Sequence, residues 1–499
     1  MKIQLNKYIK YGVFSACISM GFMSCDKHFQ EINTDPNEPS STSTSFLLSN
    51  AQKYMMDYTW DEWFNGRRGN QLAQYWSSNQ YSGESRYALR TEITNTYWAY
   101  FYARSLQDLQ EVIRLNETAP EDYIGFGATE NQIAIAKTLQ VWVYQNMTDC
   151  WGPIPFSEAL NAAEISFPKY DSQEEVYTGL LSLLNEAINS FDVSDNSVQG
   201  DLIYGGDVAR WKKFANSLKM RVGIRMADVA PTTAATAVSE AIASGVFTSN
   251  ADNALFQYRA GAPNNNPQAE DFKERNDFAA SNVMVDELNR LNDPRVGFYY
   301  SPTVNGGNFV GEVYGLSEAN AALTLNDDIS QRNPQVLAET APGIYMDYAQ
   351  VEFMLAEAAE RGIAGAGAAA THYNNGITAS LQYWDANGLL SATDINNYLT
   401  QSDVDYASLI GTETWKEVIG RQKWIALYMQ GIQGWAEYRR LDFGILQMPA
   451  DGTLDGTSIP NRMKYPLDEQ TLNGTEYATG VSILGGPDDQ DTKLWWDVN

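Results

Sequence analysis

Three observations predict a mainly all-α fold built from paired helices. Apolar residues recur at the three- and four-residue spacing of an amphipathic helix along most of the 499 residues. The helical segments come in consecutive pairs joined by polar connections. Two long stretches rich in Gly, Asn and Pro, at 247–278 and 293–342, interrupt the pattern. Stacked helix pairs form a solenoid of tetratricopeptide type, so we expect such a solenoid with large loop-rich insertions and short strands.

The first residues have the layout of an export signal. Residues 1–10 carry three lysines and no acid, and the apolar run 11–23 that follows is shorter than the about 20 residues that span a bilayer. Ser24-Cys25 resembles the lipobox of bacterial lipoproteins, although Phe22 stands where Leu is usual. We expect a signal peptide at 1–24 and a lipid on Cys25. The alternative is an ordinary signal peptide cut elsewhere.

A polar tether is expected at 25–45, followed by one folded domain at 46–499. The segment 94–116 illustrates the helical spacing, with Tyr97, Phe101, Leu109 and Val112 on one face. The same spacing predicts helices at 46–58, 70–77, 94–116, 129–146, 173–190, 208–227, 233–244, 279–292, 345–361, 366–387, 393–401 and 414–441.

The order of these segments predicts which helices pack together, because short connections favour antiparallel neighbours. The expected pairs are 94–116 with 129–146, 173–190 with 208–227, 345–361 with 366–387, and two segments within 414–441. The turn residues of 149–155 end one helix. The segment 60–69 is expected to join two helices, 298–314 to form short strands or loops, and the tail from 442 to be loops with one helical turn near 468–473.

Charge and composition narrow the function. The formal net charge is -28, which disfavours binding to nucleic acid or to anionic lipid. With 13 Trp and 29 Tyr, the chain is rich in side chains that combine an apolar face with a polar tip. Sugars are the obvious ligands of that kind, although any single ring is more often part of the core.

Chemistry that needs histidine, thiolate or metal is poorly supported. There are two His, His28 and His372, far apart in sequence, and Cys150 fits a small buried packing residue. The acidic run 488–491 fits a solvated turn better than a calcium site, since it lacks the EF-hand pattern. No cofactor, metal or catalytic residue is therefore predicted.

Two clusters of aromatic and amide residues are candidates for ligand binding. Segment 75–87 follows a predicted helix without helical spacing, and 298–314 lies in a long insertion. Flat rings can stack on sugar C–H groups, and Asn or Arg can bond hydroxyls. The predicted stacking residues are Trp76, Tyr81, Tyr87, Tyr299 and Tyr300, and the predicted hydroxyl-binding residues are Asn79, Arg86 and Asn308. The alternative is that these segments cap the helical core.

The C-terminal third resembles the SusD/RagB family. The resemblance lies in Gln422-Lys-Trp-Ile-Ala-Leu-Tyr428 with Gly434-Trp-Ala-Glu-Tyr-Arg-Arg440, in 459–466, in the ending 493–497, and in the opening 29–37. It spans nearly the whole chain and looks closest to the SusD-like group two. At helical spacing, Trp424, Leu427 and Tyr428 should be core, while Arg439 and Arg440 should make ion pairs in the last helix pair.

The resemblance implies a surface lipoprotein of the outer membrane of Bacteroidetes. Such proteins are not enzymes; they capture oligosaccharides and deliver them to a SusC-like TonB-dependent transporter. Two alternatives stay open. One is a peptide-capturing protein of the same architecture, and the other is a glycoside hydrolase, for which no acid/base pair is identifiable.

Overall fold

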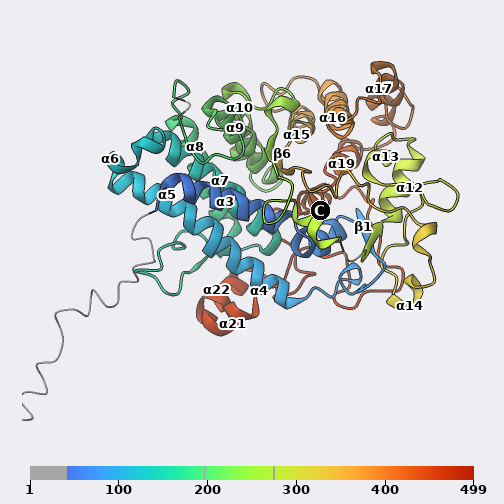
Figure 1. Ribbon diagram of the computed structural model, residues 1–499, viewed down its shortest axis with the longest axis horizontal. Coiled ribbons are helices and arrows are strands. Elements are labelled where there is room, and N and C mark those ends of the chain that lie inside the picture. Colours follow the sequence, from blue (N-terminus) through green and yellow to red (C-terminus); the bar gives the residue numbers. More distant parts are fainter. Residues whose placement is uncertain (1–41, 196, 274–275) are drawn as a thin grey trace, which may run out of the picture. The chain divides into compact units, whose positions relative to one another are not determined.

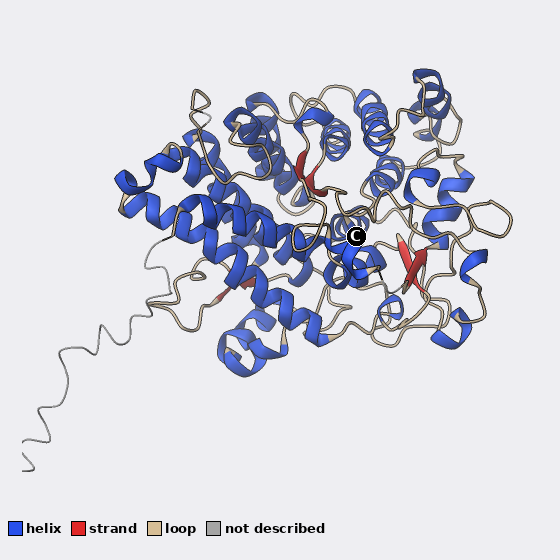
Figure 2. Cartoon of the chain, viewed as in Figure 1, coloured by secondary structure: helices blue, strands red, loops and turns tan. Residues whose placement is uncertain are grey.

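Helices dominate the structure, and strands are few and short (Figure 1, Figure 2). The computed structural model describes residues 42–195, 197–273 and 276–499, and within these Thr44–Asn499 form one unit. Cys25, the expected signal peptide and residues 25–41 of the expected tether lie outside the described residues. The mainly all-α prediction is confirmed.

The N-terminal helices stack side by side as predicted. Helix α7 packs against α5 and α8, and α9 packs against α8 and α10. The pairs 94–116 with 129–146 and 173–190 with 208–227 are thereby confirmed. The helices are α3 (Thr44–Trp60), α4 (Thr91–Tyr100), α5 (Gln107–Thr118), α6 (Pro120–Tyr123), α7 (Thr129–Trp151), α8 (Gln173–Ser190), α9 (Val208–Arg225) and α10 (Pro231–Ser244).

The C-terminal helices repeat this pairing. Helix α15 packs against α16, and α19 against both α15 and α20, which confirms the other two predicted pairs. Helices α8 and α19 each begin with a capping box, in which Ser172 pairs with Glu175 and Thr414 with Glu417. The helices are α15 (Tyr348–Glu360), α16 (Ala369–Trp384), α17 (Ala392–Leu399), α18 (Tyr406–Leu409), α19 (Trp415–Ala426), α20 (Gly431–Leu441), α21 (Leu467–Leu472) and α22 (Gly474–Leu484).

Between the helical groups lies a loop-rich region, residues 245–347. It contains α11 (Pro267–Asp271), α12 (Asn282–Arg290), α13 (Val296–Tyr299) and α14 (Glu318–Ala321). Three short strands also lie in or at the ends of this region, and three lie outside it. In order along the described residues, the strands are β1 (Trp76–Ser78), β2 (Ile154–Pro155), β3 (Tyr170–Asp171), β4 (Ala254–Phe256), β5 (Phe278–Ala280) and β6 (Gly343–Met346). They form antiparallel two-stranded ladders, β1 with β5, β2 with β3 and β4 with β6. The predicted insertions with short strands are confirmed.

The segment after α3 differs from its prediction. Residues 60–69 do not form a connecting loop between two helices but belong mostly to a π-helix, η1 (Glu62–Asn70). A second π-helix, η3 (Phe101–Leu106), connects α4 to α5. The predicted helix at 70–77 is wrong, because Gln74 takes a left-handed conformation and Trp76 pairs with Ala280. A Cβ on Gly431 would lie 2.1 Å from the carbonyl carbon of Gly69, so only glycine lets α20 approach η1 this closely.

Three other predicted boundaries need correction. The helix predicted at 279–292 begins only at Asn282, since 278–280 pair as β5. Part of 298–314 belongs to α13. The tail holds an eleven-residue helix, α22, that was not predicted, and Gly480 of this helix packs on the Tyr170 ring.

The core confirms most of what the signature residues predict. Trp424, Leu427 and Tyr428 are buried. Arg440 makes ion pairs with Glu357 at 2.5 Å and with Glu437 at 2.6 Å. The prediction is wrong for Arg439, which donates to backbone carbonyls and stacks 3.5 Å from the centroid of Trp435. Cys150 is buried, as predicted.

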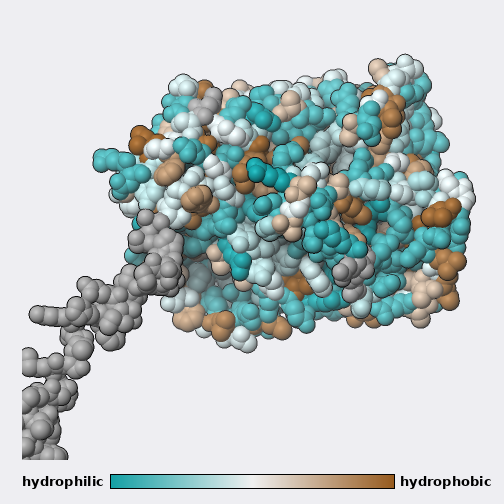
Figure 3. Space-filling view, viewed as in Figure 1, coloured by the Kyte–Doolittle hydropathy of each residue, from teal (hydrophilic) through white to brown (hydrophobic). Residues whose placement is uncertain are grey.

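The face shown in Figure 3 is mainly hydrophilic, with apolar residues in small separate groups. Within the described residues, no helix combines the length and the apolar character that crossing a membrane requires.

Candidate functional site

Four of the five predicted stacking residues have no ring face to offer a ligand. Trp76, Tyr87, Tyr299 and Tyr300 are each fully buried. Direct stacking on a sugar needs an accessible face, so the structure overturns that role for these four rings. Their segments cap the core, which is the alternative that the sequence left open.

Three of these rings belong to one buried layer organised around Tyr428. The ring centroids of Tyr299 and Tyr428 lie 4.1 Å apart in a stacked arrangement, and that of Tyr300 lies 5.4 Å from Tyr428. The indole of Trp76 donates to the Tyr428 hydroxyl at 3.2 Å. The structure therefore does bring distant predicted residues together, but inside the protein.

The remaining predicted residues are more accessible but separate. Arg86 donates to the carbonyls of Asp451 and Gly452 and thereby holds the C-terminal tail. Asn79 is nearly buried and bonds Asn326, whereas Asn308 is exposed in its loop. Tyr81 is 46% exposed, which makes it the one predicted ring with an open surface.

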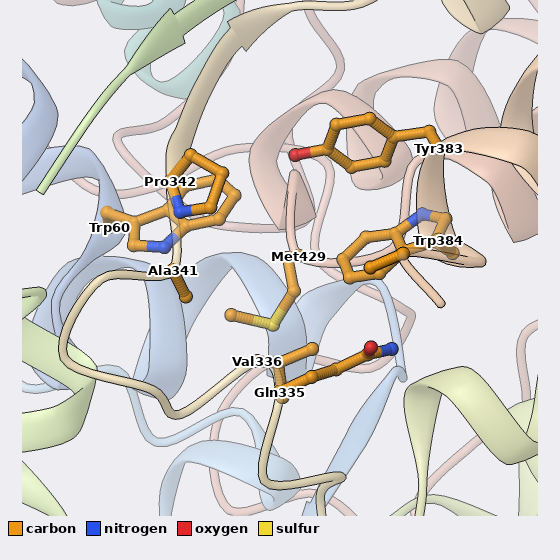
Figure 4. Close-up of a pocket in the computed structure, with 9 residues that line it drawn as sticks. Trp60, Gln335, Val336, Ala341, Pro342, Tyr383, Trp384 and Met429 are labelled. Carbon is orange, nitrogen blue, oxygen red and sulfur yellow. The ribbon is translucent and has the colours of Figure 1, made fainter. Parts of the chain in front are cut away.

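An open pocket lies next to the buried layer, where the helical and loop-rich regions meet. Its volume is about 190 Å³, and we call it the Trp384 pocket. It is lined by Trp60, Gln335, Val336, Ala341, Pro342, Tyr383, Trp384, Ala386 and Met429. Trp60 and Pro342 stand on one side, Tyr383 and Trp384 on the other, and Met429 lies between them (Figure 4).

The buried layer supports one wall of this pocket. The Trp384 ring is half-buried and packs edge-on against Tyr299 at 5.1 Å and Tyr428 at 5.6 Å between centroids. These contacts fix the indole while leaving part of it exposed. Tyr299 therefore does not line the pocket itself. It packs against Trp384, a ring that the sequence did not predict as part of the site.

The other walls are also held by specific bonds. The Gln268 amide donates to the Trp60 carbonyl at 2.7 Å, and the Asn65 amide donates to the Met429 carbonyl at 2.9 Å. Met429 has a φ of 69°, which is uncommon for a residue other than glycine. Backbone held in this conformation is found disproportionately at binding sites.

The polar groups of the pocket are few. The Gln335 amide donates to the Phe298 carbonyl, which leaves its oxygen as an acceptor. The Tyr383 hydroxyl points over Met429 (Figure 4), and burial raises the pKa of Tyr383, so this hydroxyl stays protonated at neutral pH. An apolar lining with one hydroxyl and one amide suits the face of a sugar ring.

A second accessible group of rings surrounds Arg67, on η1. The Arg67 guanidinium lies 4.9 Å from the ring centroid of Trp63 and 5.9 Å from that of Tyr81. It also pairs with Glu62 and Asp277, both at 2.8 Å. Trp63 is 41% exposed, so this cluster offers two rings fixed by one cation.

Two carboxyl groups with raised pKa values lie at the start of η1. Asp61 accepts from the backbone of Phe64 and from the Tyr97 hydroxyl, and burial raises its pKa to about 8. Asp271 accepts from the backbone of Glu62, and burial raises its pKa to about 6. Neither lines the Trp384 pocket, and the described residues that do include no carboxylate.

The acidic run near the C-terminus is occupied by protein donors. Asp488 pairs with Arg462 at 2.6 Å and accepts from the backbone of Tyr465, and Asp491 accepts from Thr457. Within the described residues, no cluster of three or more His, Cys, Asp or Glu is arranged to hold a metal ion.

Comparison with known families decides which group this chain belongs to. The family model of the second SusD-like group, "starch-binding associating with outer membrane", matches residues 36–466. The chain is a SusD-like protein. Among curated proteins, none matches it.

Several solved structures resemble this SusD-like protein over nearly its full length. A "chitin-binding protein" is 28% identical with a TM-score of 0.81, and the match covers 92% of this chain and 100% of that one. A SusD homologue from Bacteroides uniformis is 26% identical with a TM-score of 0.77, and covers 92% and 100%. A chitin-binding SusD homologue from Flavobacterium johnsoniae, at 24% identity and a TM-score of 0.77, covers 91% and 98% and shares the fold.

Proposed function

We propose that this SusD-like protein captures oligosaccharides at the cell surface, and that the Trp384 pocket binds one sugar unit of the ligand. The observation that carries the proposal is the open pocket between Trp60 and Trp384, held at the junction of the helical and loop-rich regions. The exposed part of the Trp384 ring can contact one face of a pyranose, while Tyr383 and Gln335 bond its substituents. Trp60, which is 4% exposed, closes the opposite side of the pocket.

Chitin-type chains are the first ligands to test. A relative at 28% identity is named a chitin-binding protein. The apolar lining of Val336, Ala341 and Pro342 suits an acetamido methyl group, and the Gln335 oxygen can accept from its N–H. The described residues that line the pocket include no acid/base pair, which favours binding over hydrolysis.

The proposal also includes attachment and transfer. Cys25 would carry the lipid, and the captured chain would pass to a SusC-like TonB-dependent transporter. Radiolabelled fatty acid should enter the wild-type protein but not a Cys25→Ser variant. Equal labelling of both would contradict lipid attachment at this residue.

The binding test is calorimetric titration of the purified chain with oligomers of β-1,4-linked N-acetylglucosamine. Trp384→Ala should weaken binding about five- to thirtyfold, since truncating an aromatic anchor costs on the order of 1–2 kcal/mol. Tyr383→Phe should weaken it less, because only a hydroxyl is lost. Phe167→Ala, at a ring 63% exposed outside the pocket, is the matched control.

Unchanged affinity in both pocket variants would contradict the site. Binding of basic peptides, with no binding to any glycan of a broad panel, would select the peptide-capturing alternative, which the acidic charge of -28 permits. Release of shorter products from a glycan by the purified chain would select a hydrolase.

A further inference from the structure

A second pocket, larger than the Trp384 pocket, lies along α3, the helix that contributes Trp60 to the Trp384 pocket. It has a volume of about 490 Å³, and we call it the Arg259 pocket. Its lining includes Lys53 of α3 and the segment 256–259 that leaves β4, together with Asn264. The rings of Phe256 and Tyr258 are mostly buried and form its apolar part.

Three polar side chains of this pocket have no partner within the part of the chain that the structure describes. Arg259, Gln257 and Asn264 are exposed, and their side chains make no hydrogen bond, ion pair or ring contact there. Arg259 is the one described arginine of which this is true. Elsewhere the arginines bind carboxylates, amides, carbonyls or rings, as Arg86 and Arg440 do. The Arg259 pocket therefore presents donors that are available to a ligand.

Of the charged side chains that line the pocket, Arg259 is the one without any partner in the described residues. Lys53 is paired with Asp57, which in turn accepts from the Tyr258 hydroxyl. The Asp201 carboxylate accepts from the Trp211 indole at 2.7 Å and from the backbone of Gly206 at 2.8 Å, so it is occupied by the protein. A single guanidinium in a strongly acidic protein suits hydroxyl groups better than a polyanion.

The two pockets are neighbours. Lys53 and Trp60 are seven residues apart, which places them on the same face of α3 and about 10 Å apart along its axis. Phe256 pairs with Gly343, so the chain leaving β4 runs beside 340–342, which enters β6. Ala341 and Pro342 line the first pocket, and residues 256–259 line the second. Two neighbouring segments, 256–259 and 340–342, therefore lie between the linings of the pockets, and we call them the shared wall.

We propose that the Arg259 pocket is a second sugar subsite, and that one oligosaccharide crosses the shared wall to occupy both pockets. This inference rests on the proposed function, which it deepens by assigning a minimum ligand length. A chain too short to cross the wall gains only the contacts of the Trp384 pocket. A longer chain adds hydroxyl bonds to Arg259, Gln257 and Asn264 without a second association step.

The test is the length dependence of affinity. Chitin oligosaccharides from one to six units are titrated into the wild type and into Arg259→Ala. The wild type should show a rise of at least about tenfold at the length that bridges the pockets. Arg259→Ala should remove this rise and leave the affinity for the shortest oligomers unchanged. Trp384→Ala should weaken binding at every length.

Arg114→Ala is the matched control, because Arg114 is a half-exposed arginine on α5 that does not line either pocket. Modification of Arg259 by phenylglyoxal, read by mass spectrometry, gives an independent measure, in which long oligomers should protect and short ones should not. An unchanged rise in Arg259→Ala would overturn this inference alone. If no glycan binds the wild type at any length, the proposed function is overturned and this inference with it.

Discussion

Two buried arginines, Arg440 in the helical region and Arg332 in the loop-rich region, are held in different ways. In the helical region Arg440 lies between Glu357 and Glu437, at 2.5 Å and 2.6 Å. In the loop-rich region Arg332 lies 3.4 Å from the ring centroid of Phe272, and its nearest bonded group is the Asn276 amide oxygen. Burial lowers the pKa of Arg332 to about 9. Arg440 is therefore held by ion pairs between helices and Arg332 by aromatic rings, although the loop-rich region also holds one buried ion pair, Arg295 with Asp293 at 2.6 Å.

The difference bears on function. The helical region is built from packed helix pairs, whereas the loop-rich region joins short ladders with aromatic contacts. The Trp384 pocket takes Trp60 and Trp384 from helix ends and Pro342 from the loops. The site thus lies where loops meet the ends of packed helices, a common arrangement for binding sites.

Arg440→Met should produce the largest loss of stability, because the buried Glu357 and Glu437 lose the partner that they share and each keeps weaker compensation, from Arg361 and Lys423. Removing one member of a buried ion pair costs about 3–5 kcal/mol. Urea unfolding followed by circular dichroism measures the change, with Arg114→Met as the exposed control. A loss equal to that of the control would show that the helical region does not depend on this pair.

Trp76→Ala should cost about 3 kcal/mol, since it empties a buried site beside Phe278, whose ring centroid lies 5.6 Å away. Unfolding in urea should register the loss, whereas Leu323→Ala, at a residue 80% exposed, should register almost none. Glycan affinity of the remaining folded protein should change less than in Trp384→Ala. A greater effect on glycan affinity than on stability would show that Trp76 does contact the ligand.

Arg332→Met should cost no more than about 1–2 kcal/mol, because no carboxylate is left unpaired and an apolar chain can take the place of the cation on Phe272. This is the direct counterpart of Arg440→Met under the same unfolding conditions. Equal losses in the two variants would show that the ion pairs of Arg440 and the ring contacts of Arg332 stabilise the protein equally.

Asp61→Asn should change stability least at neutral pH, by about 1 kcal/mol, and should act mainly on its pH dependence. Burial raises the pKa of Asp61 to about 8, so the folded state binds the extra proton between about pH 4 and 8. The stability from this group is full at the acidic end and is lost as pH rises through about 8. In Asp61→Asn the amide oxygen can still accept from the backbone of Phe64, but the amide does not titrate between pH 4 and 8.

Thermal unfolding from pH 5 to pH 9 should therefore show a flatter profile in Asp61→Asn than in the wild type. Asp122→Asn, an exposed residue on α6, serves as the control and should keep the wild-type slope. A steeper profile in Asp61→Asn would contradict the raised pKa.

Helix pairing was predictable because it depends on local spacing. Apolar residues three and four apart define α15 and α16 without knowledge of their surroundings. Segment 60–78 was not predictable, because the π-helix η1 and strand β1 depend on contacts with Gly431 and Ala280 far along the chain. Helix α22 was missed since its apolar pattern is weak and its packing on Tyr170 is tertiary.

The site follows the same division. The sequence located the right kind of residue, aromatic rings beside long insertions, and chose Trp76 and Tyr299, which are buried. The missed residues Trp60 and Trp384 stand at the ends of α3 and α16, where α3 meets η1 and α16 meets a loop. Rings near the ends of predicted helices were the signal available, but spacing does not tell which ring lines a pocket.

By itself, the sequence determined the mainly helical architecture, the pairing of helices and the resemblance to the SusD/RagB family, because periodicity and motif are local properties of the chain. Only the tertiary structure decided which rings are exposed. Tyr299 and Trp384 are equally aromatic, yet Tyr299 stacks on Tyr428 inside the core while Trp384 covers it from the pocket side. Burial is set by what packs around a side chain, and that depends on segments more than 40 residues away in sequence.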